Sequence, residues 1–256
     1  MFTTKQNNPC NQNINGGADT APNHMLKSQR SLKKSVLVLL SGDDTDTILA
    51  NLAAYPPESL LNALFSGICH AAEQTRWNAV LAMGATVARL ADQDMEAGRI
   101  VMRRFMWSLN DESGGIGWGA PEAMAECLAR HEGLAHEYTH ILVSFMREDG
   151  FYLELPALQR GLLWGLARMA EARPDLLRKW QAPRYLMPYL DSADPLVRGL
   201  AARCLGLLNA STAIPQITRL LDDTTPCSFY QHGQRTDFAV GDFAHQALSA
   251  FTPVHN

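Results

Sequence analysis

One group of residues in the sequence has the spacing typical of zinc hydrolases. His136 and His140 lie four positions apart and enclose Glu137, in the order His-Glu-Tyr-Thr-His. On a helix both imidazoles share one face and can hold Zn²⁺, while the carboxylate activates water. The longer form of this pattern needs Gly and a third His where the chain has Val143 and Met146. We therefore expect no metal and no other cofactor, and keep a zinc-dependent hydrolase centred on this motif as the alternative.

Acidic and aromatic residues gather in the segments that join predicted helices. Because such segments lie along one edge of a stack of helix pairs, they can form a docking strip for a protein partner. The alternative is that the acids are solvated loop residues and the aromatic rings cap the core. The candidate residues of this loop edge are Asp111, Glu112, Trp118, Glu122, Asp149, Tyr152, Glu154 and Tyr230.

A second candidate surface is formed by polar residues of the predicted second helices. These are Arg99, Arg103, His136, His140 and Arg178. They can make the concave face locally basic, and the alternative is an ordinary solvated helix surface. Four tryptophans at helical spacing, which are Trp77, Trp107, Trp164 and Trp180, we interpret as core residues.

The elements that must position these residues repeat along the chain. Five similar segments carry a small residue at an equivalent position, namely Gly84, Ala125, Ala167, Gly206 and Ser249, in steps of 41, 42, 39 and 43 residues. A period near forty is typical of stacked helix pairs. Each pair buries too little apolar surface to be stable alone, so the pairs must share one continuous core. The sequence therefore predicts an all-α solenoid, an α-α superhelix.

The predicted organisation is a single array with a short tail. Residues 1–24 are polar and predict a disordered tail, whereas residues 25–256 predict one repeat array with a helical cap over 25–72 and about five degenerate repeats over 73–251. Predicted helices cover 73–91, 93–109, 117–131, 134–148, 155–171, 174–190, 195–209, 213–222 and 240–251. Pro183 is expected to bend one of them. Two segments, 228–230 and 235–240, flank Gln231-His-Gly-Gln and predict one small β-hairpin near 227–240.

The clearest repeat allows a resemblance to be stated. Asp194-PLVRGLAARCLGLL-Asn209 resembles the HEAT-like repeats named after the phycobilisome lyases, in its Asp-Pro start, its Val-Arg and its late Leu-Gly. The stretch from Met106 to Met124 is similar to uncharacterised HEAT-repeat proteins of sulfate-reducing bacteria. The resemblance implies a binding scaffold, and within the lyase subset it implies a protein that handles tetrapyrroles, which is a further alternative.

Composition and charge exclude several classes of partner. The net charge is −4, and residues 1–34 hold five basic residues and one acidic residue, so the remaining chain carries −8. An acidic array is not expected to bind nucleic acid, which usually needs a basic face. No apolar run approaches the roughly 18 residues of a membrane span, and no secretory signal is evident, so we expect a cytoplasmic protein without membrane contact. The prediction is a non-catalytic scaffold for a protein partner of unknown identity.

Overall fold

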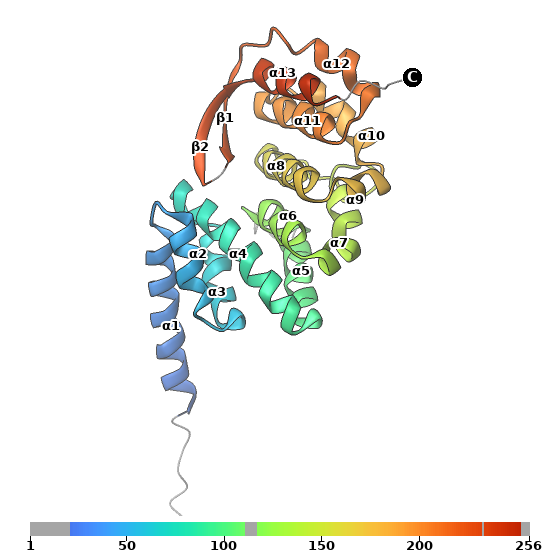
Figure 1. Ribbon diagram of the computed structural model, residues 1–256. Helices are drawn as coiled ribbons and strands as arrows, with labels where there is room; N and C mark the ends of the chain where they lie inside the picture. The colour runs from blue at the N-terminus through green and yellow to red at the C-terminus, as the bar shows by residue number, and fades with distance from the viewer. Residues whose placement is uncertain (1–20, 111–116, 232, 252–256) are drawn as a thin grey trace, which may run out of the picture.

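The computed structural model describes residues 21–110, 117–231 and 233–251, which form a stack of helices with one β-hairpin (Figure 1). Three helices come first: α1 (Ala21–Leu40), α2 (Thr45–Ala53) and α3 (Pro57–Gly67). Helix pairs follow: α4 (Glu73–Gln93) with α5 (Met95–Leu109), α6 (Ala120–Arg130) with α7 (Glu132–Ser144), α8 (Pro156–Ala172) with α9 (Pro174–Lys179) and α10 (Ala182–Leu186), and α11 (Pro195–Leu207) with α12 (Ile214–Thr218). The hairpin β1 (Pro226–Gln231) and β2 (Gln234–Ala239) leads into α13 (Val240–Ala250).

The N-terminal part differs from its predicted boundary. Helix α1 begins at Ala21, whereas the polar tail was expected to continue to residue 24. The rest of the predicted tail, residues 1–20, lies outside the described residues.

Several helices begin where an aspartate caps them. The Asp44 carboxylate accepts a hydrogen bond from the Asp46 amide at 3.1 Å, and the Asp194 carboxylate accepts one from the Leu196 amide at 3.0 Å. These bonds satisfy amides at the helix start that have no partner within the helix. In α11, Pro195 occupies the first helical position, where its missing N–H costs nothing. The starts of α2 and α11 are therefore encoded locally.

The second helix of the third pair is broken rather than bent. Helix α9 ends at Lys179, Gln181 takes a left-handed conformation with φ of 56°, and α10 starts at Ala182. Pro183 lies in the first turn of α10, a position that tolerates proline. The expected bend at Pro183 is therefore not seen: the helix is interrupted at Gln181, and a 3₁₀ turn over Met187–Asp191 completes the segment.

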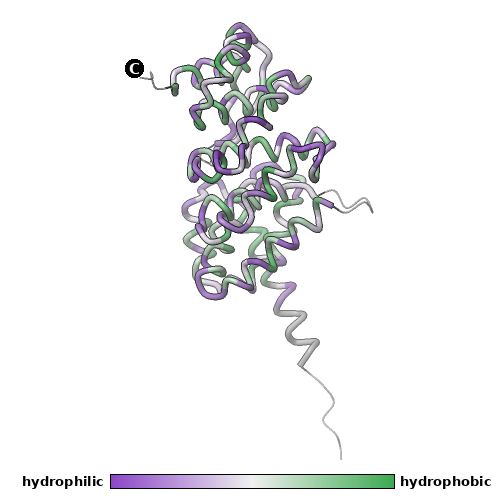
Figure 2. Tube along the Cα trace, turned by 90° about the vertical axis from the view of Figure 1, so that its right-hand side faces the viewer, coloured by the Kyte–Doolittle hydropathy of each residue, from purple (hydrophilic) through white to green (hydrophobic). Residues whose placement is uncertain are grey.

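The core runs through the first helices of the pairs. Helices α4, α6, α8, α11 and α13 pack on one another in this order. Each contributes side chains that are fully buried, for example Met83, Leu128, Leu166, Leu205 and Phe243. Figure 2 shows hydrophilic and hydrophobic residues following one another along the helical trace. Helix α6 is covered on most sides, since nine of its eleven residues are buried. Within the described ranges, no helix combines the length and the apolar character that a membrane span requires.

Small residues let neighbouring first helices approach closely. A Cβ added at Gly84 would lie 2.5 Å from Glu126 Cγ on α6, and one added at Gly206 would lie 2.6 Å from Ala247 Cα on α13. The predicted small residue of α13, Ser249, is exposed, whereas Ala247 is 2% exposed and faces Gly206, so Ala247 makes the close contact that was expected of Ser249.

The β-hairpin joins sequence-distant parts of the array. Its strands are antiparallel, with Tyr230 opposite Arg235 and Gln231 opposite Gln234. Figure 1 shows the hairpin running from α13 towards the beginning of α4, on the left of the view, whereas α7, α9 and α10 lie on the right. We call the surface formed by α4, α6, α8, α11 and the hairpin the hairpin face.

Candidate functional site

An aromatic cluster attaches the hairpin to the first helices. The rings of Trp77 on α4 and Tyr230 on β1 are stacked, with centroids 4.8 Å apart and planes 5° apart. Trp164 on α8 packs against Trp77 at 4.8 Å, and its indole N–H donates to the Tyr230 carbonyl oxygen at 2.7 Å. The aromatic cluster of Trp77, Trp164 and Tyr230 thus joins three elements that are far apart in the sequence.

Two open cavities flank this cluster. The first, which we call the tryptophan cavity, has a volume of about 700 Å³ and lies among the starts of α4, α6, α8 and α11 and strand β1. The second, which we call the tip cavity, has a volume of about 620 Å³ and lies between α2, the middle of α6 and α8, and the hairpin tip. Both are lined by Trp164, Phe229 and Tyr230, so the hairpin separates them.

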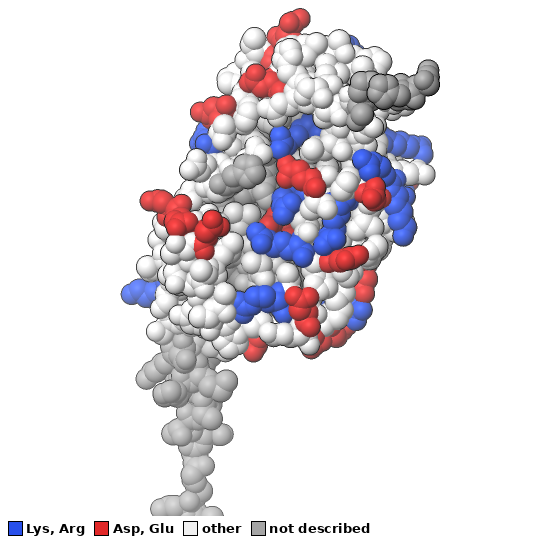
Figure 3. Space-filling view, in the orientation of Figure 1, with Lys and Arg blue, Asp and Glu red and all other residues white. Residues whose placement is uncertain are grey.

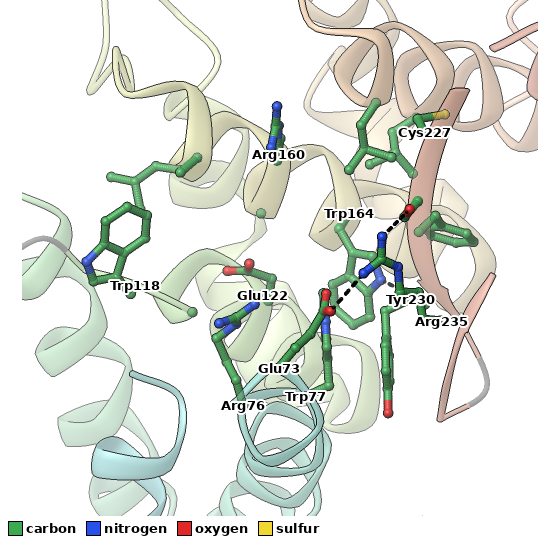
Figure 4. A pocket seen from close by; sticks show the side chains of 18 of the residues that line it. Glu73, Arg76, Trp77, Trp118, Glu122, Arg160, Trp164, Cys227, Tyr230 and Arg235 are labelled. Carbon is green, nitrogen blue, oxygen red and sulfur yellow. Dashed lines mark hydrogen bonds and ion pairs between the residues drawn. The ribbon is translucent and has the colours of Figure 1, made fainter. Parts of the chain in front are cut away.

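The turn before α6 places Trp118 at the tryptophan cavity (Figure 4). Gly119 adopts φ of 71°, a left-handed conformation, and a Cβ added at this position would clash with the carbonyl oxygen of Ile68. Only glycine tolerates both constraints readily. Trp118 remains 45% exposed, and its carbonyl oxygen accepts a hydrogen bond from the Cys69 thiol at 3.5 Å. The chain reversal at Gly119 therefore holds an exposed indole beside the cavity.

Glu122 lies in the first turn of α6 and contributes a carboxyl group to the same cavity (Figure 4). Its carboxyl lies against Gly161 of α8, where an added Cβ would be 2.5 Å from Glu122 Cδ. One carboxyl oxygen, Oε2, is buried without a hydrogen-bond partner. Burial raises the pKa of Glu122 to about 7, and its own backbone N–H and Arg76 act in the opposite direction. The cavity wall thus holds an acid that can change charge near neutral pH.

Four other charged groups of the tryptophan cavity form two ion pairs. Arg160 Nε lies 2.5 Å from Asp194 Oδ2, and Arg235 Nη1 lies 3.4 Å from Glu73 Oε2. The ion pair between Arg235 and Glu73 connects β2 to the first turn of α4. It thus joins the hairpin to the same helix as the aromatic cluster does. Two of these four residues are positively charged and two are negatively charged, so their charges cancel.

The tip cavity also contains a buried carboxylate, whose charge is neutralised by two arginines. Glu126 is fully buried, and its two oxygens accept from Arg130 at 2.5 Å and from Arg168 at 2.8 Å. Figure 3 shows Lys and Arg side chains next to Asp and Glu side chains on the face turned to the viewer. Charges of both signs are therefore interspersed on this face.

The structure brings together part of the predicted loop edge. Trp118, Glu122 and Tyr230 line the tryptophan cavity, whereas Asp111 and Glu112 lie outside the described residues. The other three predicted residues belong to the segment between α7 and α8 and line neither cavity. In that segment Asp149 pairs with Arg147 at 2.8 Å, the Tyr152 hydroxyl accepts from Gln159 at 2.9 Å, and Glu154 is exposed.

The predicted basic face of the second helices lies elsewhere. Arg99 pairs with Glu137 at 2.7 Å, Arg103 pairs with Glu96 at 2.6 Å, and Arg178 pairs with Asp175 at 2.7 Å. Neither these arginines nor His136 and His140 line the two cavities. Their use as a binding surface stays a prediction, while the cavities are formed by first helices.

The His-Glu-Tyr-Thr-His motif lies on α7 with its polar groups engaged. Arg99 donates two hydrogen bonds to the Glu137 carboxylate, which lower the pKa of Glu137 and so weaken it as a base. The His140 ring packs on Trp180 at 5.2 Å, and His136 lies 3.6 Å from Glu132. Among the described residues, no three His, Cys, Asp or Glu side chains form a group that could hold a metal.

Sequence reasoning missed much of the site. Arg76, Trp77, Arg160 and Arg235 line the tryptophan cavity, and no local pattern distinguishes them from other helix and strand residues. The interpretation of the tryptophans as core is correct for Trp164, which is 8% exposed. It is wrong for Trp107, which is 81% exposed, and for Trp180, which is 38% exposed.

Comparisons with known proteins identify the fold. The model of a family described as HEAT-like repeat matches residues 156–208. A designed armadillo repeat protein in complex with the peptide (KR)4 is 18% identical, with 91% of this chain and 96% of that chain covered and a TM-score of 0.54. An engineered protein is 16% identical over 91% of this chain and 61% of that chain, with a TM-score of 0.50. A search of curated proteins finds no match. The predicted HEAT-like solenoid with one β-hairpin is confirmed.

Proposed function

We propose that this HEAT-like solenoid is a non-catalytic binding scaffold that holds a segment of a partner protein on its hairpin face. The observation that supports this proposal best is the pair of cavities on either side of the aromatic cluster. Each is large enough for one or more side chains, and ligand sites usually combine apolar walls with a few polar groups. The structural neighbour bound to the peptide (KR)4 has the same kind of fold, which supports a peptide-like partner.

The mechanism would be recognition by a rigid shape. Trp118 is an exposed aromatic side chain beside charged residues, and such anchors supply much of the affinity of protein interfaces. Because stacked helices and the hairpin hold the cavities in place, little ordering is needed on binding. The loop between α7 and α8, with exposed Phe151 and Tyr152, would extend the contact.

No contact among the described residues favours the other two functions. A hydrolase would need Glu137 as a free base, but Arg99 holds that carboxylate. The resemblance to lyase-type repeats, and with it a role in handling tetrapyrroles, rests on repeat residues such as Asp194 and Pro195, which cap and start α11. Both alternatives, like the cytoplasmic location and the absence of nucleic acid and membrane among the partners, stay predictions.

Photocrosslinking tests the proposed surface. A photoreactive phenylalanine analogue replaces Trp118 in one protein and Trp107, which is exposed on α5, in a matched control. We expect the Trp118 protein to form a crosslink to a defined partner that purified components reproduce, and the Trp107 protein to form none.

Binding of the purified partner then measures the contribution of the cavity. Trp118→Ala is expected to weaken binding about tenfold or more, because buried aromatic anchors commonly contribute over 1 kcal/mol. Trp107→Ala should leave the affinity unchanged. A partner that crosslinks at Trp107 and not at Trp118 would assign binding to the second helices instead.

A further inference from the structure

The tryptophan cavity contains one acid without an ion-pair partner among the described residues. Its other acids, Asp194 and Glu73, pair with Arg160 and Arg235. Glu122 forms no such pair, and its Oε2 has no hydrogen-bond donor. A buried acceptor without a donor costs free energy. Because Oε2 is covered by protein, a cationic ligand in the cavity would act on this carboxyl group through its charge.

The position of this acid is built into the contact between two helices. Glu122 projects from α6 against Gly161 of α8, and a side chain at position 161 would overlap the carboxyl group. The carboxyl therefore has a defined place in the cavity wall (Figure 4). Such a fixed group can select a ligand by charge as well as by shape.

Aromatic rings form much of the cavity wall, which carries as many arginines as acids. Trp77, Trp118, Trp164 and Tyr230 line the cavity. Aromatic faces attract guanidinium and ammonium groups. The chain beyond residue 34 also carries a net charge of −8, which steers basic segments towards it.

Arg76 is the group that opposes this assignment. It lines the same cavity and acts on the Glu122 carboxyl by its charge. Its guanidinium donates to the His70 carbonyl oxygen at 3.4 Å and makes no ion pair within the described residues. An anionic ligand would use Arg76, so the two possibilities predict opposite effects of removing Arg76 or Glu122.

We propose that the tryptophan cavity receives a positively charged side chain, arginine or lysine, of the bound segment, with Glu122 as its counter-ion. This inference rests on the proposed function and specifies the chemistry of the partner. Trp118 would cover the aliphatic part and the cationic head of the guest side chain.

The five tryptophan indole N–H signals provide the test in the full chain. Capped peptides Gly-Ser-Xaa-Ser-Gly, with Xaa as Arg, Gln or Glu, are titrated into ¹⁵N-labelled protein at pH 8, where the Glu122 carboxyl group is ionised. The arginine peptide is expected to shift Trp77, Trp118 and Trp164 saturably, while Trp107 and Trp180 outside the cavity stay unchanged. The glutamine and glutamate peptides should bind about tenfold more weakly or not at all, as expected for loss of one charged contact.

Three variants complete the experiment, and two of them remove one carboxylate each. Glu122→Gln should abolish the shifts, whereas Glu132→Gln, which removes an exposed carboxylate on α7, should preserve them. Arg76→Gln should preserve or strengthen arginine binding. Circular dichroism of each variant confirms folding before titration.

The contradicting outcomes are distinct. If the arginine peptide leaves the three cavity signals unchanged, or if both glutamate variants behave alike, the assignment of Glu122 is overturned. Binding of the glutamate peptide that depends on Arg76 would overturn it in favour of an anionic guest. Crosslinking at Trp118 reports separately on the proposed function, because it requires no charge on the partner.

Discussion

At the scale of single residues, Glu122 shows how burial gives an ordinary side chain unusual properties. A glutamate in the first turn of a helix is normally solvated and favours the charged form, because the helix N-terminus is positive. Here the neighbouring helix covers the carboxyl through Gly161. The cost of burying the charge then outweighs the benefit of the helix start, and the pKa of Glu122 rises to about 7.

This shift predicts a pH dependence of stability. The folded protein holds the Glu122 proton between pH 4.5 and about 7, whereas the unfolded chain has released it. The folded state therefore binds more protons, and the free energy of unfolding should fall by about 2–3 kcal/mol as the pH rises from 4.5 to 8. Glu122→Gln should remove this fall of the unfolding free energy with pH, as measured by urea titrations at several pH values. A Glu132→Gln control should keep it, and an unchanged slope in Glu122→Gln would contradict the assignment.

At the scale of elements, close contacts between helices depend on single small residues. Gly206 on α11 faces Ala247 on α13, with backbone atoms of α13 too near for a Cβ. Gly206→Ala is expected to destabilise the protein by about 1–3 kcal/mol, despite the better helix propensity of alanine, since the rigid neighbour must shift. Ser249→Ala, at the exposed position, should change stability by less than about 0.5 kcal/mol. Equal effects of the two substitutions in urea unfolding would contradict the special role of the contact between Gly206 and Ala247.

The hairpin is held mainly by its aromatic contacts. Tyr230 is 4% exposed and stacks on Trp77, so Tyr230→Ala should lower the free energy of unfolding by about 3 kcal/mol. Arg235→Ala removes a partly exposed ion pair with Glu73 and should cost less than about 1 kcal/mol. Hydrogen exchange should show faster exchange of β1 amides in Tyr230→Ala alone. Comparable losses in both variants would indicate that charge, rather than stacking, holds the hairpin.

The sequence predicts the elements well because their signals are local. The Asp-Pro start of α11, the apolar periodicity of the first helices and the turn between two short segments near 227–240 each lie within one stretch of the chain. The site depends on contacts between segments far apart. Tyr230 stacks on Trp77 and also meets Trp164, 66 residues earlier, and no pattern in β1 specifies these partners. Trp107 was predicted to lie in the core but is exposed, because helical spacing alone does not distinguish an exposed indole from a buried one.

At the scale of the whole molecule, the hairpin changes how the array can unfold. In a plain solenoid each repeat contacts only its neighbours, so distant repeats can open independently. Here Arg235 and Glu73 are 162 residues apart in the chain and still form an ion pair. The hairpin thereby couples the end of the array to its beginning.

Removal of the hairpin should therefore reduce cooperativity. The amide of Val240 donates to the carbonyl oxygen of Thr225 at 3.1 Å, so a short Gly-Ser linker can replace residues 226–239 without separating α12 from α13. We expect urea unfolding of this variant to become broader, with a smaller m value or two steps, since α4 and α13 are no longer tied. Small-angle scattering should show a larger radius of gyration. A single transition with an unchanged m value would mean that the shared core of the first helices couples the repeats without the hairpin.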